Sequence, residues 1–124
     1  MSVSFQIRDA PDNLWNPASR VGRTYLGVGR LIEAENPEFP ALDTWLSVWT
    51  SDDYWIDPAG LAGWLRAVLD SSVVRHTQYL DLTRGFLEIS LGMLFRAGGD
   101  MVAADADQAE LVAAGRELAR TLVR

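Results

Sequence analysis

Carboxylates and tryptophans gather in one stretch of the chain. Residues 31–65 hold seven acidic side chains and no lysine, arginine or histidine, together with four of the five tryptophans, Trp45, Trp49, Trp55 and Trp64. The net charge of the whole chain is −6, so the residues outside this stretch sum to +1. Charge pairing and cation–π contact both attract a guanidinium or ammonium group to acids beside indole rings. The composition therefore predicts a recognition surface for a positively charged guest.

We place this surface in segment 38–57, where polar residues flank the aromatic ones. Tryptophan and tyrosine are frequent anchors of protein interfaces. The residues expected to bind are Trp45, Trp49, Asp52, Asp53, Tyr54 and Trp55. The alternative for each tryptophan is that its side chain is simply buried in the hydrophobic core.

Side chains for catalysis are scarce. His76 is the only histidine, and no nucleophile and carboxylate accompany it at a known motif spacing. Lysine and cysteine are absent, which excludes Schiff-base and thiol chemistry. The spacing of a calcium-binding loop is not met by Asp100, Asp105 and Asp107. One histidine without cysteine does not make up the usual set of zinc ligands. We expect no catalytic residue, metal or cofactor, and we favour a non-enzymatic protein while leaving an enzyme open.

The length and composition fit one globular domain, residues 1–124. Hydrophobic residues make up 48% and charged residues 23% of the chain, close to globular averages. The N-terminus has no signal-peptide pattern, and the most apolar run, residues 86–95, is shorter than the ~20 residues that cross a bilayer. An acidic surface disfavours nucleic acid and anionic membranes. We expect a cytoplasmic protein that binds neither.

Strands are expected in two places. Val3, Phe5 and Ile7 alternate with polar residues, which predicts a strand with one buried face, and residues 9–13 supply turn formers. Residues 41–55 fit either a helical turn or strands. A lone N-terminal strand needs a partner for its backbone groups, which favours at least one strand there.

Two helix starts share one signal. Asn16 with Pro17, and Asp57 with Pro58, each combine a capping side chain with a proline suited to the first turn. The first pair predicts a helix that ends near Glu35, and the second pair opens another helix.

Two further helices complete the fold. Residues 73–97 are apolar almost all round, which predicts a central helix. Asp107 and Glu110 have the spacing of a capping box and predict the start of the last helix at Asp107. The expected class is α+β and mostly helical, with about four main helices and a small two- or three-stranded sheet from residues 2–8 and parts of 44–56.

Glycines are unusually frequent in the expected helices. Eight of the ten fall there, and each costs about 1 kcal/mol relative to alanine. Gly22 and Gly29 lie seven residues apart on one helix face, as do Gly85 and Gly92. Close helix–helix approach is one explanation, and a groove for a ligand or partner is the other.

Three short motifs occur together. They are Leu14-Trp15-Asn16-Pro17-Ala18-Ser19, Ile56-Asp57-Pro58 and Gly85-Phe86. The set resembles a family of small actinobacterial proteins of unknown function, in which a Leu-Trp-Asn-Pro-Ser motif precedes the first helix. Ala18 stands before Ser19 here, so the motif is shifted by one, and residues 41–55 and the tail after Gly99 depart from the family. The resemblance implies a bacterial cytosolic protein and no particular activity.

The leading hypothesis is a non-enzymatic interaction protein. Segment 38–57 would neutralise a basic partner protein, as an immunity protein or antitoxin-like inhibitor does, and its charge would speed capture of that partner. The alternative is a protein or accessory enzyme of bacterial secondary metabolism that binds a small cationic ligand in a Trp-lined pocket. A homodimeric structural module is a third hypothesis.

Overall fold

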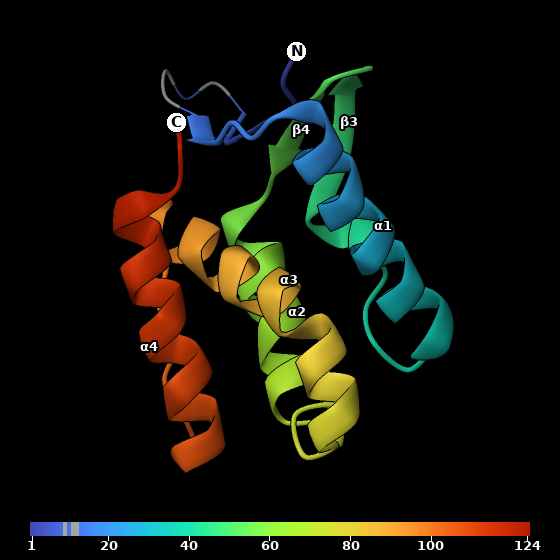
Figure 1. Ribbon diagram of the computed structural model, residues 1–124, viewed down its shortest axis with the longest axis vertical. Coiled ribbons are helices and arrows are strands. Elements are labelled where there is room, and N and C mark those ends of the chain that lie inside the picture. Colours follow the sequence, from blue (N-terminus) through green and yellow to red (C-terminus); the bar gives the residue numbers. More distant parts are fainter. Residues whose placement is uncertain (9, 11–12) are drawn as a thin grey trace.

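The computed structural model describes residues 1–8, 10 and 13–124, and these form four α-helices and a four-stranded sheet (Figure 1). The helices are α1 (Ser19–Glu35), α2 (Pro58–Leu69), α3 (Thr77–Arg96) and α4 (Ala106–Thr121), with a short 3-10 helix η1 (Leu42–Thr44). The strands are β1 (Ser4–Gln6), β2 (Asn13–Trp15), β3 (Leu46–Thr50) and β4 (Asp53–Ile56). The predicted mostly helical α+β class is confirmed, although the sheet has four strands rather than two or three.

The strand order in the sheet is β2-β1-β4-β3. The strand β1 pairs antiparallel with β2 and parallel with β4, and β3 and β4 form an antiparallel hairpin. The ambiguity of residues 41–55 is resolved in two parts, because 42–44 form the helical turn η1 and 46–55 lie in the hairpin of β3 and β4. Val3 and Phe5 are buried, which confirms the predicted inner face of the first strand. The turn predicted at 9–13 falls mostly on residues outside those described.

The two proline signals have different outcomes. The side chain of Asp57 accepts a hydrogen bond from the Gly60 amide at 3.2 Å, so the predicted start of α2 is confirmed. The start predicted at Asn16 is wrong, because α1 begins at Ser19. The Pro17 carbonyl accepts from the Val3 amide, and the Asn16 amide donates to the Val123 carbonyl, so long-range hydrogen bonds hold both backbones ahead of the helix.

The last helix begins earlier than predicted. Asp105, and not Asp107, is the cap of α4, and its side chain accepts from the Gln108 amide at 2.9 Å. Asp105 has the extended backbone that a cap requires, whereas Asp107 already lies in the first helical turn. By contrast, α3 begins later than predicted, at Thr77 rather than 73.

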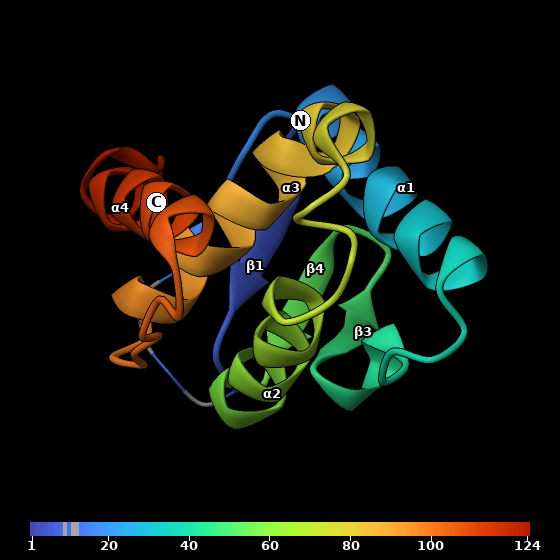
Figure 2. The same cartoon turned by 90° about the horizontal axis from the view of Figure 1, so that it is seen from below.

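The central helix is α3, which lies between α4 and α1 in both views (Figures 1 and 2). Its Leu87, Leu91 and Leu94 are fully buried, as predicted for the apolar segment. Gly29 of α1 packs closely on α3, because a Cβ there would lie 2.8 Å from the Phe86 ring. Gly92 of α3 likewise allows α4 to pack closely against it. Close helix–helix approach therefore explains these two glycines.

Candidate functional site

Two indole rings stack on the open side of the hairpin. Trp49 and Trp55 have ring centroids 5.3 Å apart and an interplanar angle of 15°. Trp49 is 53% exposed to solvent. The guanidinium carbon of Arg8 lies 4.0 Å from the centroid of the Trp55 ring. The chain thus already makes a cation–π contact with one of the rings that we expected to bind a cation.

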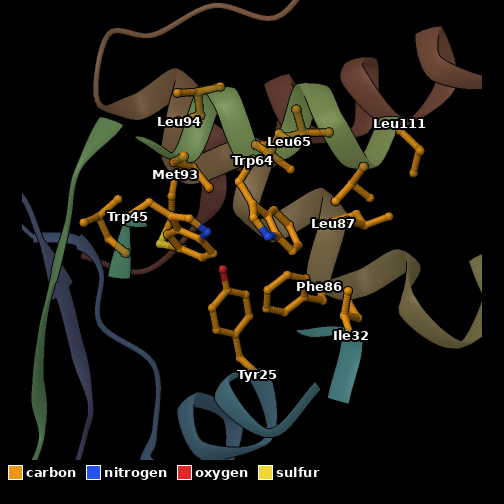
Figure 3. Packing of buried hydrophobic residues seen from close by; sticks show 14 of the residues in the cluster. Tyr25, Ile32, Trp45, Trp64, Leu65, Phe86, Leu87, Met93, Leu94 and Leu111 are labelled. Atoms are coloured by element: carbon orange, nitrogen blue, oxygen red, sulfur yellow. The ribbon is translucent and has the colours of Figure 1, made fainter. Parts of the chain in front are cut away.

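The other two tryptophans of the acidic stretch lie inside the molecule. Trp45 is 2% and Trp64 1% exposed, and their ring centroids lie 5.6 Å apart. Figure 3 shows both rings in the interior beside Tyr25 and Phe86. Among the described residues neither indole N–H has a hydrogen-bond partner. Trp45 therefore belongs to the core, and only a small part of it reaches the hollow that it lines together with Trp55.

The two acids at the hairpin tip, Asp52 and Asp53, interact with other side chains of the same chain. Asp53 accepts hydrogen bonds from the hydroxyls of Ser4 and Thr50, and these bonds hold the pKa of its carboxyl below the usual value. Asp52 lies 3.9 Å from the guanidinium of Arg23 on α1. These contacts fasten the hairpin to β1 and to α1, so both acids have a structural role beside any binding role.

Tyr54 is turned toward the other face of the sheet. Its ring stacks on Phe5 with centroids 5.6 Å apart. Strand alternation places it opposite to its neighbour Trp55, so the structure does not bring Tyr54 and Trp55 together.

A hollow of about 300 Å³ adjoins the stacked indoles. Its lining includes the predicted binding residues Trp45 and Trp55, together with Arg8, Ser47, Asp43 and Asp57. We call this region, with Trp49, the sheet-face surface. Asp57 is engaged as the cap of α2, whereas Asp43 forms no ion pair with a described residue.

Arg8 is the site residue that our sequence prediction missed. Ser4, Gln6 and Arg8 occupy alternate positions of the first strand and its extension, opposite to the buried Val3 and Phe5. That alternation was the available signal. The pairing of β1 with β4, which brings Arg8 beside Trp55, required the structure.

The residues weighed for acid–base or metal chemistry, His76 and Asp100, have other surroundings in the structure. His76 is exposed at the start of α3 and its side chain makes no capping bond. Asp100 binds Arg116 at 2.9 Å, and no group of three or more potential metal ligands occurs among residues 1–8, 10 and 13–124. No helix of the described residues has both the length and the apolar character to span a membrane.

The fold and the site define a mostly helical α+β protein with a small mixed sheet. Its whole length, residues 1–124, matches the model of a family described as a family of unknown function (DUF6086), and the chain belongs to that family. The predicted membership of a family of unknown function is therefore confirmed. Comparison with curated proteins and with solved structures gave no match.

Proposed function

We propose that the protein is a non-enzymatic interaction protein whose sheet-face surface binds a cationic segment of a basic partner protein, in the manner of an immunity protein or antitoxin-like inhibitor. The observation that carries the proposal is the guanidinium of Arg8 over Trp55. It is an internal example of the contact that a partner's arginine would make. A bacterial cytoplasmic setting is part of the proposal and rests on the sequence resemblance.

Charge supports a basic partner. The chain carries −6, and the acidic stretch 31–65 supplies more than all of it. Asp43 lines the same hollow as Trp55 and adds an acidic residue to this surface. A field of this sign accelerates the capture of a basic protein and weakens as salt is added.

The edge of the sheet supports an extended peptide as the bound segment. Among the described strands β3 is at the edge of the sheet, so one side of its backbone has no neighbouring strand. Its sequence, Leu46–Thr50, carries no charge and no proline, the features that usually protect an edge. A partner strand alongside β3 would set alternate side chains against Trp49.

The alternative, a small-ligand protein with a pocket made by the tryptophans of the acidic stretch, has weaker support. Trp45 and Trp64 pack against each other in the core, and Trp45 is only 2% exposed although it lines the hollow beside Trp55. Trp49 and Trp55 instead present a surface, which suits a protein partner.

A hexa-arginine peptide tests the proposal by isothermal titration calorimetry. We expect Trp49→Ala to weaken binding about tenfold, because an exposed aromatic anchor is lost without disturbing the core. Arg8→Gln should strengthen binding, because it removes the internal competitor for Trp55. Arg75→Gln is the matched control, since it removes one exposed positive charge from the loop before α3.

The two arginine variants have the same net charge, and repeating the titration at about 0.5 M salt screens the remaining difference in charge near the site. A stronger gain for Arg8→Gln than for Arg75→Gln supports a site at Trp55. Equal affinities for the two variants, or unchanged affinity in Trp49→Ala, would contradict the proposed surface.

A further inference from the structure

An apolar groove runs between α1 and α3, away from the sheet-face surface. It consists of two adjoining hollows of about 460 and 330 Å³. Val28 of α1 and Leu82 of α3 line both hollows and so lie at the middle of the groove. Arg20 lines the first hollow and Glu35 the second, so the groove has a positive end and a negative end.

Large apolar side chains stand exposed along this groove. Leu82 is 84%, Leu31 59% and Val21 50% exposed. Contiguous apolar surface of this kind marks an interaction site in soluble proteins. The two helices thus present a face that nothing within the described chain covers.

Gly85 of α3 lies in the same groove. A Cβ at this position would meet no heavy atom within 4 Å, unlike the Cβ at Gly29, which would meet Phe86. Packing within the chain therefore does not explain a glycine that weakens the helix here. Its bare backbone leaves room for the close approach of another element.

We propose that a second copy of this chain occupies the groove, in a two-fold symmetric dimer. The order of charges on α1 supports this occupant. Arg20 and Glu35 are 15 residues apart, about 22 Å along a helix, and the midpoint between them falls at Gly27 and Val28. Val28 is also where the two hollows meet.

A two-fold axis through that midpoint runs α1 antiparallel to the same helix of the partner. Arg20 then faces the partner subunit's Glu35, and the reverse pair forms at the other end, as a symmetric interface requires. Neither Arg20 nor Glu35 makes an ion pair with a described residue of its own chain. The charge pattern is therefore complementary to itself.

The shape of the groove agrees with the same axis. Leu82 projects between the two hollows, so each copy offers one protruding side chain and a hollow on either side of it. Two α1 and two α3 helices would pack as a four-helix arrangement. The sheet-face surface remains open in this dimer, so the inference does not depend on the proposed function.

Sedimentation velocity between about 1 and 100 µM protein tests the dimer. We expect a species of twice the 13.7 kDa monomer mass. Leu82→Glu should shift the protein to monomer, because it places a charge at the centre of the interface. Val102→Glu is the control, since Val102 is 73% exposed outside the groove and its replacement should leave the dimer intact.

Charge exchange tests the arrangement of the two copies. Arg20→Glu alone should weaken the dimer about tenfold, because two opposite-charge pairs become like-charge pairs. The double variant Arg20→Glu with Glu35→Arg should restore the affinity. A monomer at every concentration, a dimer unaffected by Leu82→Glu, or a double variant no better than the single one overturns the proposal, and a monomer that takes up an apolar dye in the groove assigns the groove to a small ligand.

Discussion

The phenol oxygen of Tyr25 lies 2.6 Å from the hydroxyl oxygen of Ser90, and this buried contact joins α1 to α3. The Ser90 hydroxyl also lies 2.7 Å from the carbonyl oxygen of Phe86, which can only accept. Because a serine hydroxyl has one proton, Ser90 donates to Phe86 and accepts from Tyr25. The two ends of the contact are therefore not equivalent.

We expect Ser90→Ala to lower the free energy of unfolding by about 1–3 kcal/mol, because it leaves the buried phenol donor without an acceptor. Tyr25→Phe should cost about 1 kcal/mol, because Ser90 keeps its bond to Phe86. Urea unfolding of the two variants measures the difference. A larger loss in Tyr25→Phe than in Ser90→Ala would show the donor assignment to be wrong.

Burial also gives Tyr25 an effect on alkaline stability. Desolvation raises the pKa of its phenol well above the usual value, and the Ser90 hydrogen bond offsets only part of this. The unfolded phenol ionises near pH 10, so stability is fully present below about pH 10 and falls by about 1.4 kcal/mol per pH unit above it. The absence of lysine leaves few other groups that titrate there.

Urea unfolding at about pH 9 and about pH 11 measures this slope. Tyr25→Phe should flatten the slope and Tyr54→Phe should not, because only the first removes the buried phenol. Equal slopes in the wild type and in Tyr25→Phe would exclude Tyr25 as the cause.

Substitution of glycines should separate packing from backbone freedom. A Cβ at Gly63 of α2 would meet nothing within 4 Å, so Gly63→Ala should raise the free energy of unfolding by about 0.5–1 kcal/mol. A Cβ at Gly115 of α4 would clash with the Cβ of Leu91 on α3, so Gly115→Ala should lower it by about 1–3 kcal/mol. Thermal unfolding followed by circular dichroism compares them, and effects of the same sign would contradict the described α3–α4 packing.

Gln108 ties the start of α4 to the end of α2. It is buried, its side-chain amide donates to the Leu69 carbonyl at 3.0 Å, and its side-chain oxygen accepts from Arg66 at 2.6 Å. We expect Gln108→Ala to cost about 2 kcal/mol, because the buried Leu69 carbonyl and the partly buried Arg66 each lose a hydrogen bond. Gln78→Ala, at an exposed position of α3, is the control and should change stability by less than about 0.5 kcal/mol in the same urea assay.

Local signals in the sequence were enough for much of the fold. The Asp57 cap with Pro58 gave the start of α2, because a capping side chain and a proline act within one turn. The same signal failed at Asn16, because residues 16 and 17 make long-range backbone hydrogen bonds with Val123 and Val3. At Asn16, tertiary hydrogen bonds therefore outweighed the local preference for a helix start.

The site was less predictable than the fold. Four tryptophans in one acidic stretch suggested a single surface, but Trp45 and Trp64 lie in the core while Trp49 and Trp55 stack outside. Which indole faces solvent depends on the hairpin register and on where β3 begins. Composition does not carry that information, because a shift of one residue reverses the face of every side chain in a strand.

The parallel pairing of β1 with β4 constrains how the chain is made. Phe5 lies opposite Tyr54. The first strand is therefore synthesised almost fifty residues before the strand with which it pairs. Until then β1 has only the short β2 beside it, and its apolar side chains have no completed sheet to join. The N-terminal strand therefore cannot complete its sheet before the hairpin has been synthesised, and long-range contacts of this kind slow folding.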